Sequence, residues 1–169
     1  MTLSRKEILA AMRRGEISIA PFDASCVGAV SIDLHLGGEF AVFAKKNAAI
    51  EVCENSVFPS KKVSASRQMP LRLAPMQFVL GVTRERITLS PKYCARIEGR
   101  SRFARLGLMV HISSSLIHPG SDNVQVLEIV NLSPATLLLR PGEKICQVTF
   151  EKLSSPAEYH GKFKTQTGV

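Results

Sequence analysis

Hydrophobic and polar residues follow two different periods along this chain, and the first is helical. Three apolar residues near the N-terminus recur at the spacing of one helix face: Ile8, Leu9 and Met12. Ser4 and Glu7 stand three residues apart, which is the spacing of a capping box. Gly15 then offers a stop. The pattern predicts a short helix that begins after Ser4 and ends before Gly15.

The period changes to two after this helix. Apolar residues take every second position from Val30 to Leu36, which predicts a strand. We expect the glycine pair at 37–38 to break this strand and residues 39–43 to resume it.

The rest of the chain is a weakly patterned segment followed by many short strands. In residues 44–70 we expect only one short strand, over 50–52. From residue 71 onward, β-prone runs alternate with proline- and glycine-containing turns: 71–73, 77–83, 86–89, 93–98, 108–112, 124–131, 135–139 and 145–151. Residues 101–106 suit one helical turn. This spacing is typical of an all-β sandwich, barrel or jelly roll, and we expect a single domain over 1–153.

The C-terminal tail, residues 154–169, is polar and basic and carries two isolated aromatic residues without apolar periodicity. Tails of this kind are usually disordered. The alternative is a lid that becomes ordered over a ligand. Both readings of this segment stay open from the residues alone.

Composition restricts the class of protein. A chain of 169 residues fits one domain with a full hydrophobic core. Hydrophobic content of 45% and charged content of 21% are ordinary for a globular protein. No apolar run approaches the roughly 20 residues of a membrane span, and the N-terminus lacks a signal-peptide core. We therefore expect a cytoplasmic protein with no membrane partner.

The net charge of +8 could serve nucleic acid, a membrane surface or a polyphosphate ligand. Tryptophan is absent and only two tyrosines are present, so a stacking platform for single strands is poorly supplied. The basic residues are also scattered, apart from a cluster at 100–105 and the tail. These features favour a phosphate-bearing small molecule and make nucleic acid an unlikely partner.

The cysteine and histidine pattern does not predict a zinc site. The four cysteines are far apart and none forms a C-x-x-C pair: Cys26, Cys53, Cys94 and Cys146. The four histidines show no H-E-x-x-H or H-x-E arrangement. We expect reduced, partly buried cysteines and no zinc.

The densest group of candidate functional residues follows Gly99: Arg100, Ser101, Arg102 and Arg105. If a helical turn starts near Ser101, its free N–H groups and the guanidinium groups can converge on a phosphate. Arg105 lies four residues beyond Ser101 and hence on the same side of that turn. The alternative is a solvated basic loop with no chemical role. Arginine suits bidentate phosphate recognition, which favours the anion site.

A single carboxylate lies in an otherwise apolar strand. The alternation places Glu128 on one face with Val124, Val126 and Val130. A glutamate in line with three valines tends to lose solvent contact, and a carboxylate so placed can act as a general base and then as an acid. A structural pair with an arginine is the equally weighted alternative.

Three further polar residues are ambiguous. His111 and His118 stand near expected strand ends, where a lone histidine is more often structural than catalytic. Asp33 lies between two apolar residues, either on a strand face or as a buried hydrogen-bonding anchor. The sequence does not decide between these roles.

Several stretches together resemble the dCTP deaminase family, which shares its fold with the trimeric dUTPases. They follow in family order over nearly the whole length: Leu3-Ser4, Ser31 to Gly37, Gly99-Arg100-Ser101 with Ala104 to Leu108, Val126-Leu127-Glu128, Leu139 to Gly142, and Lys162-Phe163 with Gln166. The block from Gly99 to Leu108 together with Leu127-Glu128 is the most specific part.

The resemblance implies a distorted β jelly roll of the dUTPase-like β-clip type, assembled as a homotrimer with three sites between subunits. It implies a deoxynucleoside triphosphate as substrate, bound with Mg²⁺, and a deamination that needs no zinc. The zinc deaminases use a metal-bound hydroxide and an H-x-E and P-C-x-x-C pattern, which this chain lacks.

The resemblance also implies a role for each candidate residue. Glu128 would activate the water that attacks C4 of cytosine, and Arg105 would hold Glu128 and the water in place. The other residues would bind substrate: Arg100, Ser101, Arg102, Ser114, His118, Lys162, Phe163 and Gln166. Arg100 and Ser101 would contact phosphates, with Lys162 and Gln166 arriving from the tail, and Ser114 would lie near the base.

The chain departs from the family at several positions. His118 stands where the family usually has an aspartate, which contacts the sugar hydroxyl and in dUTPases helps to position the attacking water. Leu116, Arg102, Phe163 and Ser121 also differ from the common residues. These changes make a pure dUTP pyrophosphatase the runner-up, together with a bifunctional deaminase–pyrophosphatase. A non-catalytic nucleotide-binding trimer is a third reading.

Overall fold

The computed structural model of the protein describes residues 1–44 and 49–169. Its elements are α1 (Arg5–Arg13), β1 (Ile17–Ala20), the 3₁₀ turn η1 (Ala24–Cys26), β2 (Ser31–Phe43), β3 (Ser60–Ser64), β4 (Leu71–Leu73), β5 (Phe78–Leu89), β6 (Tyr93–Gly99), α2 (Ser101–Ala104), β7 (Leu108–Val110), β8 (Leu116–Ile117), β9 (Asp122–Asn131), β10 (Leu137–Leu139) and β11 (Lys144–Lys152). The expected N-terminal helix, the helical turn after residue 100 and the predominance of strands are confirmed. None of the described helices has the length and apolar character to cross a membrane.

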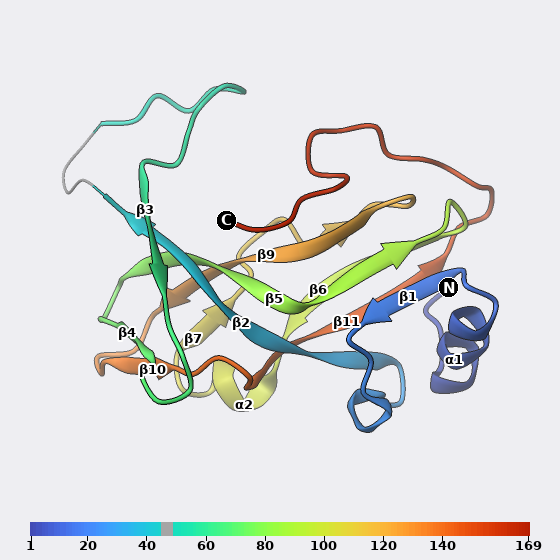
Figure 1. Cartoon of the computed structure of the whole chain (residues 1–169), viewed down its shortest axis with the longest axis horizontal. Coiled ribbons are helices and arrows are strands. Elements are labelled where there is room, and N and C mark those ends of the chain that lie inside the picture. Colours follow the sequence, from blue (N-terminus) through green and yellow to red (C-terminus); the bar gives the residue numbers. More distant parts are fainter. Residues whose placement is uncertain (45–48) are drawn as a thin grey trace.

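Most strands belong to one strongly curled antiparallel sheet (Figure 1). Its main path runs β7-β9-β5-β2-β11-β6-β8, and β1 and β3 pair at the sides with β5 and β2. A separate ribbon joins β4 to β10. The sheet curls on itself like half a barrel, so the predicted all-β fold, a distorted jelly roll with a short N-terminal helix, is confirmed.

The concave side of the sheet holds the hydrophobic core. Phe40 of β2 and Phe150 of β11 are the largest fully buried side chains. Within β9 burial alternates, so that Leu127 and Ile129 face the core while Glu128 faces the other way and is half-buried. The four cysteines are free, and all but Cys53 are buried.

Two expected strand breaks were wrong. The glycine pair at 37–38 does not end a strand, because β2 runs from Ser31 to Phe43. A Cβ on Gly37 would lie 3.1 Å from the carbonyl oxygen of Val82, so this glycine lets β2 and β5 approach closely where their register shifts. Likewise 77–83 and 86–89 form one strand, β5, with an irregularity against β9 instead of a turn.

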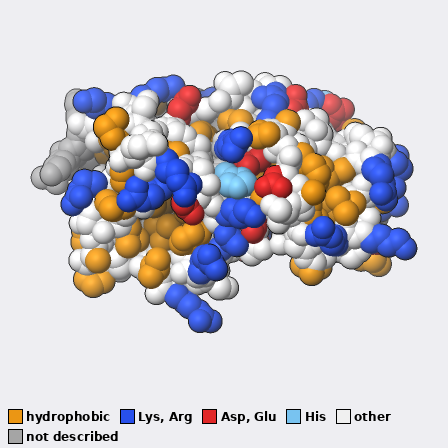
Figure 2. All heavy atoms as spheres, turned by 60° about the horizontal axis from the view of Figure 1, so that its bottom comes forward, with side chains coloured by type: hydrophobic (Ala, Val, Ile, Leu, Met, Phe, Trp, Pro, Cys, Tyr) orange, Lys and Arg blue, Asp and Glu red, His pale blue; other side chains and the backbone are white. Residues whose placement is uncertain are grey.

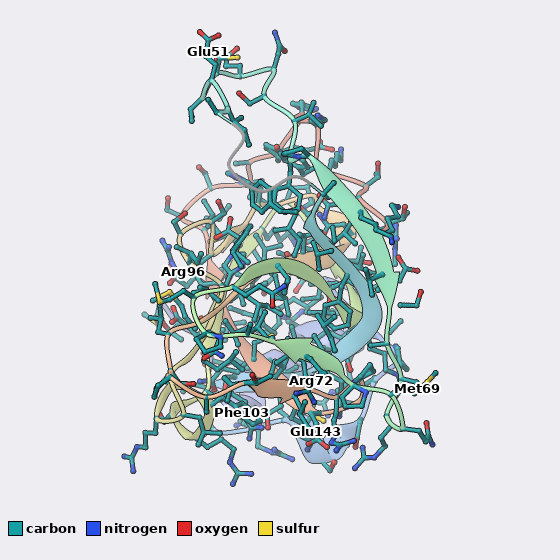
Figure 3. All side chains as sticks on the ribbon, turned by 90° about the vertical axis from the view of Figure 1, so that its left-hand side faces the viewer. Glu51, Met69, Arg72, Arg96, Phe103 and Glu143 are labelled. Carbon is teal, nitrogen blue, oxygen red and sulfur yellow. The ribbon has the colours of Figure 1, made fainter. Side chains whose placement is uncertain are left out.

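The expected strand over 50–52 was also wrong. Residues 49–52 carry no regular structure, and Glu51 lies at the far end of an arm that projects beyond the sheet (Figure 3). The strand of this segment is β3, ten residues later, which pairs with the outer half of β2. Lys61 and Lys62 are exposed on this edge, so β3 has no apolar alternation that sequence reasoning could detect. The short strands β1 and β8 were likewise missed.

Basic side chains are spread over the surface that carries α2. Figure 2 turns this side toward the viewer and shows lysine and arginine side chains across its whole width, with apolar areas between them. One apolar groove here has a volume of about 160 Å³. It is lined mainly by Phe103, Leu106, Leu108, Leu137 and Leu138, of which Leu106 and Leu138 are exposed.

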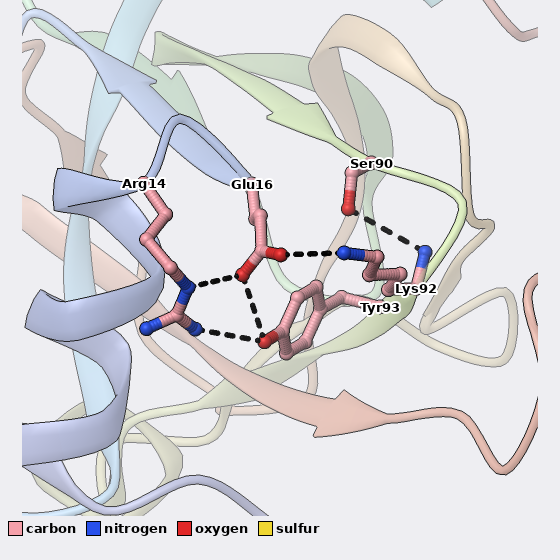
Figure 4. Close-up of polar contacts among 5 residues, drawn as sticks. All are labelled: Arg14, Glu16, Ser90, Lys92 and Tyr93. Atoms are coloured by element: carbon pink, nitrogen blue, oxygen red, sulfur yellow. Dashed lines mark hydrogen bonds and ion pairs between the residues drawn. The ribbon is translucent and has the colours of Figure 1, made fainter.

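A polar cluster fastens the end of α1 to the turn between β5 and β6 (Figure 4). The Glu16 carboxylate accepts hydrogen bonds from Lys92 Nζ at 2.9 Å and Arg14 Nε at 2.7 Å. Tyr93 Oη donates to the same carboxylate at 3.2 Å. Lys92 and Arg14 together lower the pKa of Glu16 from its ordinary value of 4.5 to about 2.

We expect Glu16→Gln to lower stability at neutral pH and to matter less in acid. The pKa of Glu16 is lower in the folded state than in the unfolded state. Its charge therefore stabilises the fold above about pH 4.5, and this contribution is lost as the pH falls toward 2. Urea unfolding of both proteins at several pH values measures the difference. A difference that stays constant from pH 7 to pH 2.5 would contradict the assignment.

Candidate active site

A cavity of about 510 Å³ lies between β9, the turns before and after β8, and the C-terminal tail. Its lining combines apolar and polar side chains: Leu80, His111, Ser114, Leu116, Ile117, His118, Ser121, Asn123, Val124, Gln125, Val126, Glu128, Tyr159, Phe163, Gln166, Gly168 and Val169. This size and this mixture suit a small organic ligand.

The tail is held against β9 by hydrogen bonds. β7 covers only the end of β9, from Ile129 to Asn131, so the outer edge of the preceding residues is open to another partner. Three hydrogen bonds join the tail to β9: Asp122 N to Lys164 O (2.9 Å), Val124 N to Gln166 O (3.2 Å) and Asn123 Nδ2 to Phe163 O (2.6 Å). A fourth, from Tyr159 N to Pro119 O (3.0 Å), joins the tail to the segment before β9. This arrangement places the tail beside the cavity, and its role as a lid stays a prediction.

Glu128 is held at the wall of this cavity by the turn after β7. Its Oε2 accepts hydrogen bonds from the backbone amides of Ile112 and Ser113, each at 3.1 Å. Its own carbonyl accepts from His111 N at 2.8 Å. Two amides therefore fix the orientation of the carboxylate. In the described part of the chain, no donor bonds Oε1, which leaves that oxygen available to a ligand or a water.

His111, at the start of this turn, has an unfavourable backbone conformation and an unsatisfied side chain. Its backbone has φ = 73°, in the left-handed region that non-glycine residues rarely adopt. Both ring nitrogens are buried and have no hydrogen-bond partner among residues 1–44 and 49–169. Strain and unsatisfied polar atoms of this kind tend to occur at functional sites. His111 lines the same cavity as Glu128.

The structure brings half of the predicted site residues together. Five of them line the cavity: Ser114, His118, Glu128, Phe163 and Gln166. Lys162 belongs to the same tail but is exposed, with its Nζ 5.7 Å from the centre of the Phe163 ring.

The arginine cluster lies elsewhere. In Figure 1, α2 is at the bottom of the molecule, while the tail crosses the top. Ser101, Arg102 and Arg105 are exposed, and no described hydrogen bond or ion pair links Arg105 to Glu128. Arg100 is half-buried. Its guanidinium lies 3.1 Å from Asp33 Oδ2 and donates to Lys144 O at 2.7 Å, so Asp33 is the anchor of an arginine.

Two cavity residues were missed by sequence reasoning. Asn123 is buried, and its amide links the tail to Gln125 by donating to Phe163 O and accepting from Gln125 Nε2. Tyr159 stacks on His118. An isolated tyrosine in a polar tail was the only available signal for the second, and nothing local marked the first.

Comparison with known proteins identifies the family. The sequence model of the dCTP deaminase-like family matches residues 2–153. The chain belongs to the dCTP deaminase-like family. It is 38% identical over 159 residues to a dUMP-forming dCTP deaminase of Beutenbergia cavernae, and this alignment covers 94% of this chain and 83% of that protein. It is 39% identical over 168 residues to a dCTP deaminase of Thermomicrobium roseum, with 93% and 82% coverage.

A solved structure supports the fold of this family member. The crystal structure of 2′-deoxycytidine 5′-triphosphate deaminase from Agrobacterium tumefaciens superposes with a TM-score of 0.69 and 19% identity. The match covers 88% of this chain and 47% of that one, so this chain spans about half of the matched structure. At this identity the match shows a shared fold alone.

We expect Arg100→Ala to destabilise this family member. The change leaves Asp33, which is only 21% exposed, without its ion-pair partner and removes a donor from Lys144 O. The free energy of unfolding should fall by about 1–3 kcal/mol, whereas the exposed Arg102→Ala should change it by less than about 0.5 kcal/mol. Urea unfolding compares the two variants, and equal effects would rule out the anchoring role of Asp33.

Proposed function

We propose that this protein is a hydrolase that deaminates dCTP to dUTP and ammonia. The observation that carries the proposal is the Glu128 carboxylate, fixed by two amides at the wall of a cavity that suits a pyrimidine nucleoside. The relatives that match over most of the chain are named as dCTP deaminases, which supplies the substrate.

The chemistry follows from one free carboxylate oxygen. Oε1 of Glu128 accepts a proton from a water molecule as the water oxygen bonds to C4 of cytosine. Oε2 stays bound to the amides of Ile112 and Ser113, so the carboxylate keeps its orientation. The proton then passes from Glu128 to the amino nitrogen at C4. The C4–N bond breaks and ammonia leaves, and the proton of the hydroxyl at C4 passes to N3, so that the base becomes uracil.

The phosphates of the substrate need positive charge, and the described residues that line this cavity include no lysine or arginine. The exposed residues Ser101, Arg102 and Arg105 lie on α2, on the other side of the molecule from the tail. We propose that α2 of one subunit completes the cavity of the next, so that Arg105 reaches the neighbour's carboxylate. Two different surfaces that meet in this way form a closed ring when the rotation between subunits closes, and the family resemblance implies a homotrimer.

The apolar groove beside α2 supports this assembly. Leu106 and Leu138 are 57% and 45% exposed and border a hollow also lined by Phe103. Figure 3 shows Phe103 and Glu143, which also lines the groove, at the same end of the molecule. Exposed apolar surface next to a half-complete binding site is suited to a subunit contact.

Magnesium enters this proposal as part of the substrate. A triphosphate is usually bound as its Mg²⁺ complex, in which phosphate oxygens supply several ligands. The residues proposed to contact the phosphates are arginines, Ser101, Lys162 and Gln166, which suit the negative charge of the phosphates better than they suit a metal ion.

A bifunctional enzyme is the second candidate. Several of the relatives are named dUMP-forming dCTP deaminases, which favours cleavage of the triphosphate after deamination. His118 argues against it, because an imidazole cannot supply the negative charge of the aspartate that the resemblance leads us to expect there. Incubation with dCTP and Mg²⁺ followed by chromatography separates the candidates, since the products are dUTP in one case and dUMP with pyrophosphate in the other.

Glu128→Gln should abolish ammonia release from dCTP. The amide still accepts a hydrogen bond from the 112–113 turn but cannot accept a proton, so we expect at least a 10³-fold loss of kcat. Ammonia assays measure the loss, and size-exclusion chromatography checks that the assembly is unchanged. Full activity of Glu128→Gln would refute the assigned base, and nucleotide binding without turnover in the parent protein would favour a non-catalytic role.

A further inference from the structure

One aromatic pair joins the tail to the wall of the cavity. The rings of Tyr159 and His118 are stacked, with centroids 4.3 Å apart and an interplanar angle of 9°. Tyr159 belongs to the tail, and His118 follows β8 in the body of the protein. Both line the cavity that holds Glu128. This stack is therefore a contact between side chains of the two parts that enclose the cavity.

The backbone around the stack is shaped to seat Tyr159. Tyr159 N donates to the carbonyl oxygen of Pro119 at 3.0 Å, and Pro119 directly follows His118 in the chain. Gly120 has φ = 75°, and a Cβ there would lie 2.9 Å from Glu158 Cγ. At Gly161 a Cβ would overlap the Tyr159 ring itself. Any larger residue at 161 would displace the tyrosine, so the tail folds around this one side chain.

The stack leaves the polar atoms of both rings free. Within the described residues, no hydrogen bond engages the imidazole nitrogens of His118 or the hydroxyl of Tyr159, and neither residue is fully buried. The contact between the rings is thus aromatic packing alone. A carboxylate at position 118 could not make this contact, because it has no ring to stack.

We propose that the Tyr159–His118 stack is the latch that holds the tail closed over the cavity, and that Tyr159 is a positioning residue for the bound nucleotide. The tail is closed by this contact before any ligand arrives, and it opens to admit the nucleotide. The part of the proposal that concerns the nucleotide rests on the proposed function. The latch itself does not, because it joins two segments of the protein.

Backbone amides of β9 report whether the latch is closed. Asp122 N and Val124 N donate to carbonyls of the tail, Lys164 O and Gln166 O, and lose these bonds when the tail lifts. Their hydrogen–deuterium exchange, measured by NMR on the full chain without nucleotide, therefore follows tail opening. The amide of Val130, in the part of β9 that pairs with β7, should be unaffected and serves as an internal reference.

We expect Tyr159→Ala to speed exchange at these two amides about two- to tenfold, because loss of an aromatic stack raises the population of the open tail by about that factor. Tyr159→Phe keeps the ring and should exchange as the parent does. His118→Phe should also keep the slow exchange, whereas His118→Asp should behave like Tyr159→Ala. Unchanged exchange in Tyr159→Ala, or equally fast exchange in Tyr159→Phe, would overturn the latch.

A kinetic measurement tests the role of Tyr159 toward the nucleotide. With dCTP as substrate, Tyr159→Ala should raise KM about two- to tenfold and change kcat less than twofold, because the latch acts on binding and not on the proton transfers of Glu128. A fall in kcat at constant KM would overturn this role. If no deamination is found at all, the proposed function fails, while the exchange experiment still decides whether the latch exists.

Discussion

The outer edge of β9 must find partners for its backbone amides and carbonyls, and the way it does so creates the cavity. β7 pairs with Ile129–Asn131 at one end of this edge. The tail bonds Asp122 and Val124 at the other end. Between them, the turn that begins at His111 bonds both the carbonyl and the carboxylate of Glu128. One strand edge therefore fixes both Glu128 and the C-terminal tail.

The same arrangement separates the Glu128 carboxylate from the arginines on and beside α2. α2 follows β6 and lies on the opposite side of the molecule from the tail. Arg100 is paired with Asp33, whereas Ser101, Arg102 and Arg105 are exposed. The proposed site, which needs both the Glu128 carboxylate and the arginines of α2, would be completed between subunits. Assembly and catalysis would then depend on one another.

Sequence reasoning was most successful where the chemistry is local. The capping spacing of Ser4 and Glu7 predicted the helix, and the alternation around Glu128 correctly placed it on the face of β9 opposite Leu127 and Ile129. It failed at positions whose role depends on a distant partner. Gly37 looked like a break because the close approach of Val82 is invisible in the sequence, and the lysine-rich β3 is a strand only because β2 offers it an edge.

The sequence by itself determined the β class, the single acid in an apolar strand, the arginine cluster and the family to which they belong, because periodicity and motif spacing are properties of neighbouring residues. Only the tertiary structure decided that the arginines and Glu128 lie apart, that the tail completes the edge of β9 and that Tyr159 meets His118. The contacts of the tail join residues 40 or more positions apart, and their geometry depends on how the sheet curls rather than on any local pattern.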